Sequence, residues 1–354
     1  MKIITSDIII IGAGLTGLTL AYLLRNSPYK VTIVEARERL GGRIFTSYQN
    51  DEAPIEMGAT WLNNSHTYLN TLLEELNIGI FKQELGEKAI YEPSSLTPYQ
   101  LVTLPNNSDS SYRIKGGSSL LINKLAKSIS EKTIFYNEVI TSIHEESDGV
   151  TIKSNKKTFE SKIVISTLPP YLLQSSIHMT PNLPSNIQEV MESTHTWMGE
   201  SIKVGLRFKE AFWKVNKSSG TIFSNVGPIP EFYDHSNYEN NSYALKGFLN
   251  NSYFELSKEE RLNLILNQLR KYYGDIVDNY INYEEKVWRK EPYSYSEYNK
   301  HILPHQNNGH HLFSKPYLNN KLYVAGAETA IDFSGYMEGA IRSAHRIFNT
   351  LKEK

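Results

Sequence analysis

The chain has 354 residues, 40% of them hydrophobic and 21% charged, and its 37 basic and 38 acidic residues give a formal net charge of −1. This balance argues against nucleic-acid binding, and the absence of cysteine from the sequence excludes disulfides, thiolate metal sites, cysteine nucleophiles and a cofactor tethered through a thioether. No apolar run approaches the roughly 18 residues of a membrane span, so we expect a soluble, cytoplasmic protein with no membrane anchor, and the length favours two domains.

The first predicted unit is a strand, a turn and a helix at the N-terminus. The run DIIII from Asp7 is continuously apolar, as a strand covered on both faces should be, and a helix over 15–25 and a strand over 30–35 follow it. Between strand and helix, Gly12-Ala13-Gly14-Leu15-Thr16-Gly17 matches the G-x-G-x-x-G fingerprint of a dinucleotide site. Glu35 ends the second strand and can accept hydrogen bonds from ribose hydroxyls, which argues against the 2′-phosphate of NADP. NAD and FAD both remain open at this point.

A glycine pair follows this unit in the stretch EARERLGGRI, residues 35–44. Gly41 and Gly42 would let the backbone come close to a ligand. Arg43 adds a cation that could clamp a pyrophosphate through two parallel hydrogen bonds. The stretch is therefore a candidate second contact for a dinucleotide.

The next part of the chain alternates helices and strands around one irregular stretch. Leucines at helical spacing predict a helix over 68–77. Residues 80–112 contain three prolines and a polar run, which is typical of a crossing between domains. The elements predicted after it are a helix over 118–130 and strands near 133–143, 149–153 and 162–167.

The second half begins with segments typical of antiparallel strands and continues into a helix. The strands are predicted over 200–210, 219–226 and 243–249, and the helix over 258–273. Ser257 and Glu260 form a capping box at the start of this helix, and Gly274 suits its end.

The last predicted unit is again a strand, a glycine and a helix. An apolar strand over 322–325 runs into Gly326, and a helix rich in small residues begins near Gly335. Two similar devices therefore stand at opposite ends of one chain.

Several blocks of sequence resemble, in order, those of the flavin-containing amine oxidases, a family that includes monoamine oxidases, polyamine oxidases and L-amino-acid oxidases. The blocks span nearly the whole chain and are DIIIIGAGLTGLTLAYLL, VTIVEARERLGGRI, EMGATWL, IKGGSSLLINKLA, VISTLPP, SIKVGLRFKEAFW and LYVAGAETAIDFSGYMEGAIRSA. The resemblance implies that both glycine devices hold one FAD. The N-terminal device would take the ADP half, and the C-terminal device the ribityl chain and the flavin.

The fold expected for such a chain is α/β, with a Rossmann-like FAD-binding domain of the two-dinucleotide-binding-domain flavoprotein type. This domain would be assembled from residues 1–79, 113–170 and 290–354. A second, α+β substrate domain, built on a mixed or antiparallel sheet, would come from residues 80–112 and 171–289. The ligand should lie between the two domains, as is common for such sites.

The resemblance also implies which residues contact FAD. They are Gly12, Gly14, Leu15, Thr16, Gly17, Glu35, Ala36, Arg37, Gly42, Arg43, Gly58, Ala59, Thr60, Trp61, Val139, Thr167, Trp288, Gly326, Ala327, Glu328, Gly335, Tyr336, Met337 and Ala340. Three residues would carry the chemistry. Tyr298 and Tyr336 match the pair of facing aromatic residues that confine the amine, and Lys203 matches the lysine that reaches flavin N5 through a water molecule.

The reaction implied is amine oxidation. A hydride passes from the carbon next to nitrogen to flavin N5, water hydrolyses the imine, and oxygen reoxidises the flavin with release of hydrogen peroxide. Glu297 stands where monoamine oxidases carry the cysteine joined to flavin, so this FAD should be non-covalent. The interval from Trp61 to Arg113 is shorter than in most relatives. It is expected to lack the helical block over the substrate cavity, which leaves an open site or one closed by another subunit.

The substrate and the oligomeric state stay open. Residues 44–112 contain no arginine, the usual carboxylate clamp of L-amino-acid oxidases, although Arg207 or Arg289 could substitute. Two other functions remain as alternatives: a desaturase or protoporphyrinogen-oxidase-like enzyme of the same fold, and a flavin-binding protein without catalysis. The histidines between 301 and 311 lack a partner carboxylate at suitable spacing, so no metal site is predicted.

Overall fold

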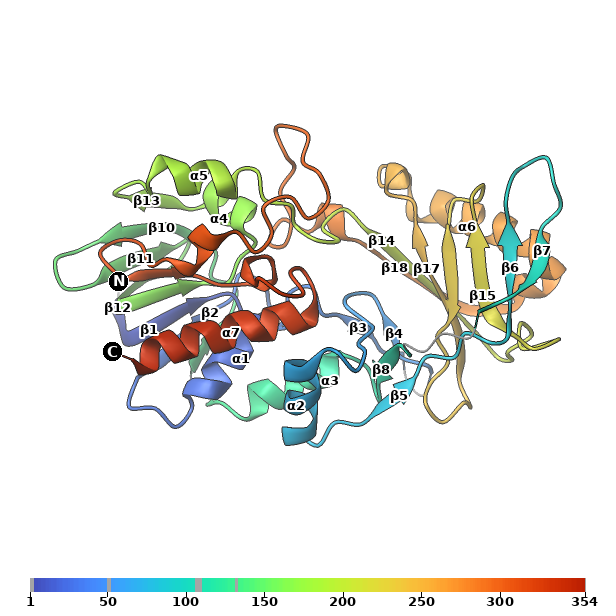
Figure 1. Cartoon of the computed structure of the whole chain (residues 1–354), viewed down its shortest axis with the longest axis horizontal. Helices are drawn as coiled ribbons and strands as arrows, with labels where there is room; N and C mark the ends of the chain where they lie inside the picture. Colours follow the sequence, from blue (N-terminus) through green and yellow to red (C-terminus); the bar gives the residue numbers. More distant parts are fainter. Residues whose placement is uncertain (1–2, 50–51, 106–109, 131–132, 354) are drawn as a thin grey trace.

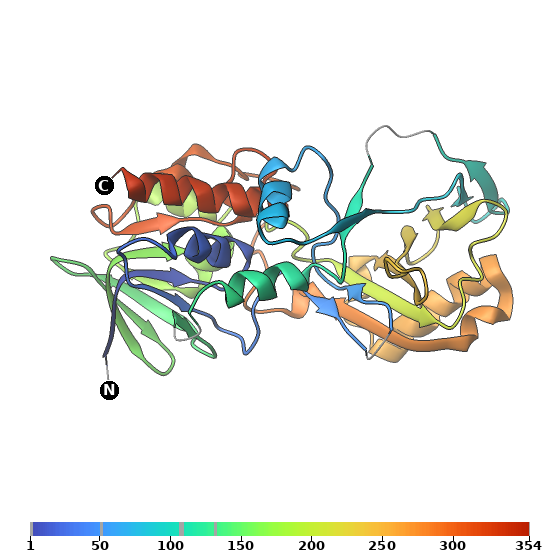
Figure 2. The same cartoon turned by 90° about the horizontal axis from the view of Figure 1, so that it is seen from below.

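The computed structural model describes residues 3–49, 52–105, 110–130 and 133–353. Two bodies lie side by side, each built on one large β-sheet (Figures 1 and 2). The first strand and the last helix belong to the same body, so the chain leaves this body and returns to it. None of the helices in the described part of the chain combines the length and the hydropathy that crossing a bilayer requires.

The first sheet has the strand order β13-β10-β11-β12-β1-β2-β9, with β19 paired to β12. Its strands are β1 (Ile3–Ile11), β2 (Val31–Val34), β9 (Ile134–Phe135), β10 (Ile140–Glu145), β11 (Val150–Ser154), β12 (Thr158–Ser166), β13 (His178–Thr180) and β19 (Leu322–Val324). Strand β1 pairs in parallel with β2 and β12, and β12 pairs in parallel with β19. Strands β10, β11 and β12 form an antiparallel meander at one side.

Helices cover this sheet on both faces. They are α1 (Leu15–Leu24), α2 (Thr67–Glu75), α3 (Ser119–Lys127), α4 (Pro170–Ser176), α5 (Ser185–Met191) and α7 (Met337–Lys352). In β1, Ile8 and Ile10 pack with α1, α3 and α7, whereas Ile9 and Ile11 pack with α4 and α5. Because both faces are covered, the strand is a continuous run of isoleucines.

The second sheet has the order β18-β14-β17-β16-β15-β6-β7 and is mixed. Its strands are β6 (Lys88–Glu92), β7 (Gln100–Thr103), β14 (Ile202–Phe208), β15 (Ser218–Ser224), β16 (Glu231–Asp234), β17 (Tyr243–Leu249) and β18 (Tyr280–Val287). Helix α6 (Lys258–Tyr273) covers one face, where Val204 and Leu206 join the same apolar cluster as Ile265 and Leu269. This architecture confirms the expected fold class.

The other face of the second sheet meets the first body. Lys203 and Arg207 project from β14 on this face, and Arg207 donates to the carbonyls of Ala53 and Ser47. Two short two-stranded antiparallel sheets connect the bodies here: β3 (Thr46–Ser47) with β4 (Ile55–Glu56), and β5 (Ile80–Lys82) with β8 (Tyr112–Ile114). Lysine and arginine side chains are therefore buried where the two bodies touch.

Most predicted elements form, and two differences have physical causes. The strand predicted over 133–143 is split into β9 and β10, because Asn137 takes a left-handed backbone conformation with φ 57°. The described part of the stretch 80–112 contains β5, β6, β7 and the start of β8, because β6 pairs both with β7 of the same stretch and with the distant β15. Among the described residues of that stretch no helix forms. The capping box of Ser257 and Glu260 is confirmed.

The predicted domain boundary at residue 170 is corrected by the contacts that follow it. Strand β13 pairs with β10 of the first sheet, and Ile187 and Met191 of α5 lie in the core of the same body. The first body therefore extends to about Met191 along the chain. The remaining divisions of the chain stay predictions.

Candidate active site

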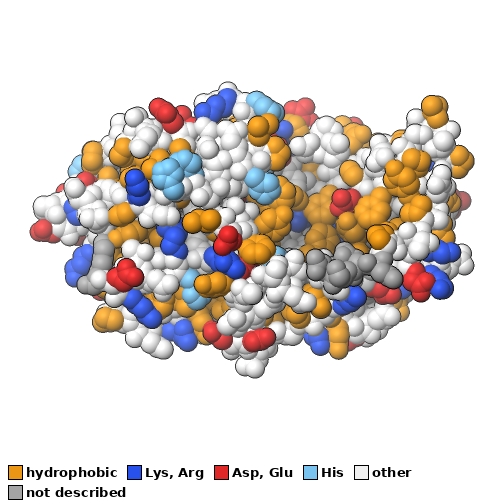
Figure 3. Space-filling view, viewed as in Figure 1, with side chains coloured by type: hydrophobic (Ala, Val, Ile, Leu, Met, Phe, Trp, Pro, Cys, Tyr) orange, Lys and Arg blue, Asp and Glu red, His pale blue; other side chains and the backbone are white. Residues whose placement is uncertain are grey.

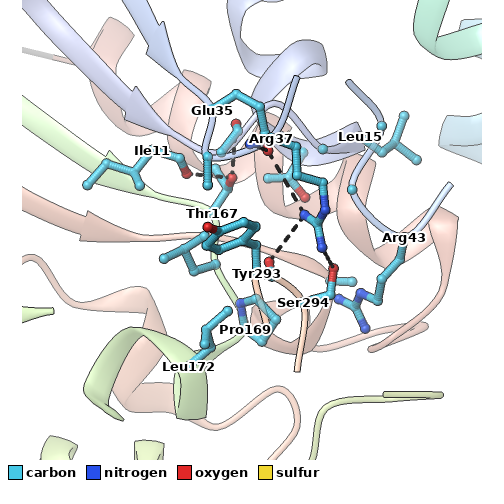
Figure 4. A pocket seen from close by; sticks show the side chains of 18 of the residues that line it. Ile11, Leu15, Glu35, Arg37, Arg43, Thr167, Pro169, Leu172, Tyr293 and Ser294 are labelled. Carbon is cyan, nitrogen blue, oxygen red and sulfur yellow. Dashed lines mark hydrogen bonds and ion pairs between the residues drawn. The ribbon is translucent and has the colours of Figure 1, made fainter. Parts of the chain in front are cut away.

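A long cavity runs across the carboxyl ends of β1 and β2, where α/β folds commonly bind ligands (Figure 4). It holds about 1270 Å³ of empty space, including the part open to solvent. The predicted cofactor residues that line it are Gly12, Gly14, Leu15, Thr16, Glu35, Ala36, Arg37, Gly42, Arg43, Ala59, Val139, Thr167, Ala327, Gly335, Tyr336, Met337 and Ala340. We call it the dinucleotide cavity.

The floor of this cavity next to α1 is bare backbone. Gly14 is the N-cap of α1, and no side chain caps the helix there. A Cβ on Gly14 would meet only the Cα of Gly42, at 4.0 Å, so the two glycines leave a cradle between them. Amide groups and the positive end of the helix dipole open into this cradle, which suits a phosphate group. The residues present therefore fit the pyrophosphate of a dinucleotide.

Glu35 and Arg37 form one wall of the dinucleotide cavity. The buried carboxylate of Glu35 accepts hydrogen bonds from the backbone N–H groups of Ala13 (2.8 Å) and Arg37 (2.9 Å). Each carboxylate oxygen keeps a further lone pair for a ribose hydroxyl. The Arg37 guanidinium lies 4.0 Å from a carboxylate oxygen of Glu35 and reaches Ser294 in the loop after β18 (Figure 4). It also donates to Glu291 of that loop. Arg37 thus ties that loop to the cavity wall.

Gly17 and Gly326, both predicted cofactor residues, support the cavity from behind. A Cβ on Gly17 would lie 2.1 Å from the carbonyl oxygen of Gly12, so only glycine lets α1 pack this closely on the turn after β1. Gly326 has φ 128°, a conformation that favours glycine, and its N–H donates to Ser343. Both residues shape the backbone of the two devices.

Arg43 and the buried carboxylate of Glu328 form an ion pair between the two glycine devices. The guanidinium donates to both carboxylate oxygens, at 2.6 and 2.8 Å, and to the carbonyl of Trp197 at 2.9 Å. Burial lowers the pKa of Arg43, but the charge and hydrogen bonds of Glu328 outweigh it, so the pKa is raised. The two guanidinium N–H groups of Arg43 that were expected to bind a pyrophosphate therefore donate to Glu328 instead. This pair joins the N-terminal and C-terminal segments.

A second cavity adjoins the first, with about 850 Å³ of empty space including the part open to solvent. We call it the aromatic cavity. Its lining contains Gly58, Ala59, Thr60, Trp61, Trp197, Met198, Lys203, Phe248, Trp288, Tyr336 and Met337. Hydrophobic side chains gather in the hollow between the two bodies on the face seen in Figure 3. The two cavities share Arg43, Ala59, Gly335, Tyr336 and Met337 in their linings, so they adjoin each other at these residues.

Lys203 lies in the wall of the aromatic cavity and is 5% exposed. Its Nζ donates to the carbonyl of Gly58. Burial lowers the pKa of Lys203 to about 8, although the charge of Glu56 acts in the opposite direction. The side chain is therefore placed to hold or release a proton near neutral pH.

Tyr336 and Tyr298 line different hollows, so the structure does not bring the expected aromatic pair together in one cavity. Tyr336 lines both cavities, and the ring beside it is that of Trp197, at 5.8 Å with an interplanar angle of 36°. Tyr298 lines a separate polar hollow, packs its ring against Tyr171, and accepts a hydrogen bond from the N–H of Thr196. The chain over 291–310 forms no regular strand or helix, so the spacing of the motif does not set where Tyr298 points.

Other predicted residues are accounted for as follows. Trp288 lines the aromatic cavity and donates its Nε1–H to the carbonyl of Met57. Arg207 is held by backbone carbonyls and Arg289 by Glu297, so neither offers a free cation to the cavity. Among the described residues, no group of three metal-binding side chains comes together.

Several site residues were missed by the sequence analysis. Trp197 lies six residues before Lys203 in the stretch THTWMGESIK, and this proximity was the signal available. Phe248 and Lys246 lie on β17 and reach the site only because β17 pairs with β14, which sets Phe248 opposite Lys203. Glu56 is likewise brought in by the β3–β4 hairpin.

Comparison with known proteins decides the family. The model of the flavin-containing amine oxidoreductases matches residues 15–92 and 80–347. The chain belongs to this family. It is 25% identical over 452 residues to a probable flavin-containing monoamine oxidase A of Dictyostelium discoideum, an alignment covering 98% of each chain, and 24% identical to human amine oxidase [flavin-containing] B, covering 96% of this chain and 85% of that protein.

Solved structures of this family share the fold. A putrescine oxidase bound to putrescine superposes with a TM-score of 0.85 at 21% identity, covering 100% of both chains. A cyclohexylamine oxidase from Brevibacterium oxydans superposes with a TM-score of 0.86 at 18% identity, covering 98% of this chain and 99% of that one. The alignment with the Dictyostelium relative is 98 residues longer than the 354 residues of this chain, so this family member is a short one.

Membership makes the chain an FAD-dependent oxidoreductase. The cradle of Gly14 and Gly42, the carboxylate of Glu35 and the uncapped start of α7 at Tyr336 are the features that would hold the pyrophosphate, the ribose and the flavin. Because the sequence contains no cysteine, FAD is not bound through a cysteine thioether.

Proposed function

We propose that this enzyme oxidises an apolar monoamine with oxygen as electron acceptor. When bound, FAD takes a hydride from the carbon next to the amine nitrogen and passes the electrons to oxygen as hydrogen peroxide, while water hydrolyses the imine product. The observation that carries this proposal is that the dinucleotide cavity adjoins an aromatic cavity lined by Lys203. A cytoplasmic location stays a prediction from the sequence.

The lining of the aromatic cavity favours an apolar amine over a polyamine or an amino acid. Among its described lining residues the charged ones are Arg43 and Lys203, and there is no carboxylate. The second ammonium group of a polyamine would therefore lose its water without gaining a counter-charge. A substrate carboxylate would need a free cation, but Glu328 holds Arg43, and Lys203 donates to Gly58.

The residues of the chain supply position and a water-poor surface. The rings of Trp197 and Tyr336 form an angled wall that confines an apolar substituent and orients the amine. Trp61 and Phe248 extend the apolar surface deeper into the cavity, with their ring centroids 5.7 Å apart. Lys203 can hold or release a proton at this wall. Tyr336 lines both cavities, so its ring would lie where the amine meets the flavin.

The direct test is reduction of the bound flavin without oxygen. The purified, FAD-loaded enzyme is mixed anaerobically with cyclohexylamine, benzylamine, putrescine or L-leucine, and the visible flavin absorbance is followed. We expect the two apolar amines to bleach the flavin with kcat/KM at least about tenfold above the other two, a difference of about 1.4 kcal/mol in transition-state binding. Bleaching by none of these amines, together with bleaching by a hydrogenated porphyrin, would assign the chain to the alternative carbon–carbon dehydrogenases.

A pair of variants tests the aromatic wall in the same assay. Trp197→Ala removes the ring beside Tyr336, and we expect kcat/KM for cyclohexylamine to fall by about 10–100-fold because the amine loses its orientation. Tyr99→Ala, which removes a partly exposed ring elsewhere in the second body, is the matched control. Equal activities of the two variants would place the amine outside the aromatic cavity.

A further inference from the structure

A second lysine, Lys246, lies directly behind the wall of the aromatic cavity. It is fully buried on β17, and its cross-strand neighbours are Gly205 and Tyr233. Because Lys203 pairs with Phe248, Lys203 and Lys246 are diagonal neighbours on one face of the sheet. Two lysines on one buried face are unusual, since an ammonium group is rarely buried without a partner.

A chain of hydrogen bonds joins the two lysines through the loop that lines the cavity. Lys246 Nζ donates to the hydroxyl oxygen of Thr60, the Thr60 hydroxyl donates to the carbonyl of Gly58 at 3.1 Å, and Lys203 donates to the same carbonyl. Thr60 and Gly58 both line the aromatic cavity. A hydroxyl rotates freely between donor and acceptor roles, so Thr60 can connect the cavity with Lys246.

The charges around Lys246 do not balance two ammonium groups. The charged and titratable groups that face it are Lys203 on β14, Glu56 on β4, Arg113 on β8, His235 after β16 and Tyr233 on β16. Glu56 is the acid of this set, and its carboxylate also accepts hydrogen bonds from Thr46 and Ser118. Burial, and then the charge of Lys203, lower the pKa of Lys246. Both causes favour the neutral amine, which carries a free lone pair.

The surroundings of Lys246 also contain aromatic rings that would partly stabilise its charged form after it accepts a proton. Its Nζ lies 4.6 Å from the ring centroid of Trp61 and 5.6 Å from that of Phe248, where a cation is stabilised by aromatic faces. Beyond it, Glu56 lines a separate cavity together with His235 and Arg113. His235 Nδ1 and Arg113 Nε are buried there without a hydrogen-bond partner among the described residues. A proton leaving Lys246 would therefore meet polar groups on the far side.

We propose that Lys246 accepts the proton that an amine substrate must lose before it can be oxidised. The inference rests on the proposed function, since amines arrive mostly protonated at neutral pH. The N–H bond of the substrate ammonium breaks and an O–H bond forms at Thr60, while the original Thr60 proton passes to Lys246 and forms its third N–H bond. One proton moves and no electron does. Thr60 touches the substrate, and Lys246 is a positioning residue that acts through it.

The protonation state of Lys246 is measured first, without any turnover. Carbon-13 is placed at the ε position of all lysines of the FAD-loaded enzyme, and the NMR shifts are followed against pH, with Lys203→Met and Lys246→Met assigning two of the signals. We expect the Lys246 signal to show a neutral amine at pH 7. A Lys246 signal that titrates with the exposed lysines would overturn the proposal.

The second arm follows anaerobic bleaching by cyclohexylamine against pH. Lys246→Met should slow bleaching by about 100-fold at pH 7, and the rate should recover as the pH rises above about 10.4, where an alkylammonium loses its proton in solution. Thr60→Val should behave in the same way, whereas Thr60→Ser, which keeps the hydroxyl, should retain most of the wild-type profile. Wild-type and Lys246→Met profiles of the same shape would overturn this proposal alone. Failure of every amine to bleach the wild-type enzyme would remove the proposed function as well.

Discussion

Gly14 and Gly17 lie three residues apart in the same fingerprint, but the space that each leaves free has a different use. A Cβ on Gly14 would project into the cradle beside Gly42, whereas a Cβ on Gly17 would lie 2.1 Å from the carbonyl oxygen of Gly12. The first glycine therefore leaves room for the cofactor and the second leaves room for the chain. The backbone of Gly14 is extended, so alanine fits its conformation without strain.

This difference predicts opposite phenotypes for two alanine variants. Gly14→Ala should keep the melting temperature of the apoprotein and weaken FAD binding by at least about tenfold, or 1.4 kcal/mol. Gly17→Ala should lower the stability of the apoprotein by about 1–3 kcal/mol, because overpacking forces α1 away from β1. Flavin fluorescence titration and thermal melting of the apoprotein measure the two effects. An apoprotein of Gly14→Ala as unstable as that of Gly17→Ala would contradict this assignment.

At the scale of elements, α7 supports α2 through one buried carboxylate. Glu338, in the first turn of α7, accepts hydrogen bonds from the N–H groups of Tyr68 (3.2 Å) and Leu69 (2.8 Å) at the start of α2. The N-cap residue of α2, His66, makes no side-chain cap of its own. A carboxylate from a distant part of the chain thus accepts hydrogen bonds from amides at the start of α2 that have no partner within the helix. Its negative charge also interacts favourably with the positive end of the α2 dipole.

Removing this charge should loosen the start of α2. In Glu338→Gln we expect faster hydrogen exchange at the amides of Tyr68 and Leu69 and a loss of about 1–2 kcal/mol in the free energy of unfolding. Glu75→Gln, at the exposed end of the same helix, is the control and should change neither quantity measurably. Unchanged exchange at both amides in Glu338→Gln would show that α2 does not depend on this cap.

At the scale of the whole molecule, the contact between the two bodies contains a buried lysine that destabilises the fold. The pKa of Lys203 is lowered by burial from its usual 10.5 to about 8 in the folded chain. Between these pH values the unfolded chain binds more protons than the folded chain, so stability rises with pH. The full destabilisation, about 3 kcal/mol from the size of the shift, is present below about pH 8 and is gone above about pH 10.5.

Lys203→Met should therefore stabilise the apoprotein in a pH-dependent way. At pH 7 we expect its free energy of unfolding to exceed that of the wild type by up to about 3 kcal/mol, and this gain should vanish by about pH 10.5. Urea unfolding followed by circular dichroism at several pH values measures it. Lys162→Met, whose side chain is 75% exposed, should show no such trend. A gain of equal size at every pH would mean that Lys203 titrates as an ordinary lysine.

Local signals determined much of this molecule from the sequence alone. The glycine fingerprint after β1, Glu35 at the end of β2, and helix α6 with its Ser257–Glu260 capping box all formed where the sequence placed them. Each of these features depends on residues that lie close together in the chain. The hydrophobic period and the turn residues therefore carry enough information to define them.

Only the tertiary structure decided how the aromatic cavity is built. Trp197, and not Tyr298, stands beside Tyr336, because the chain after β18 is irregular and its direction is set by packing. Lys246 reaches the cavity wall through the register of β17 on β14, and a shift of one residue would turn it to the opposite face. Strand register and loop direction depend on contacts between distant segments, and no local pattern in the sequence contains them.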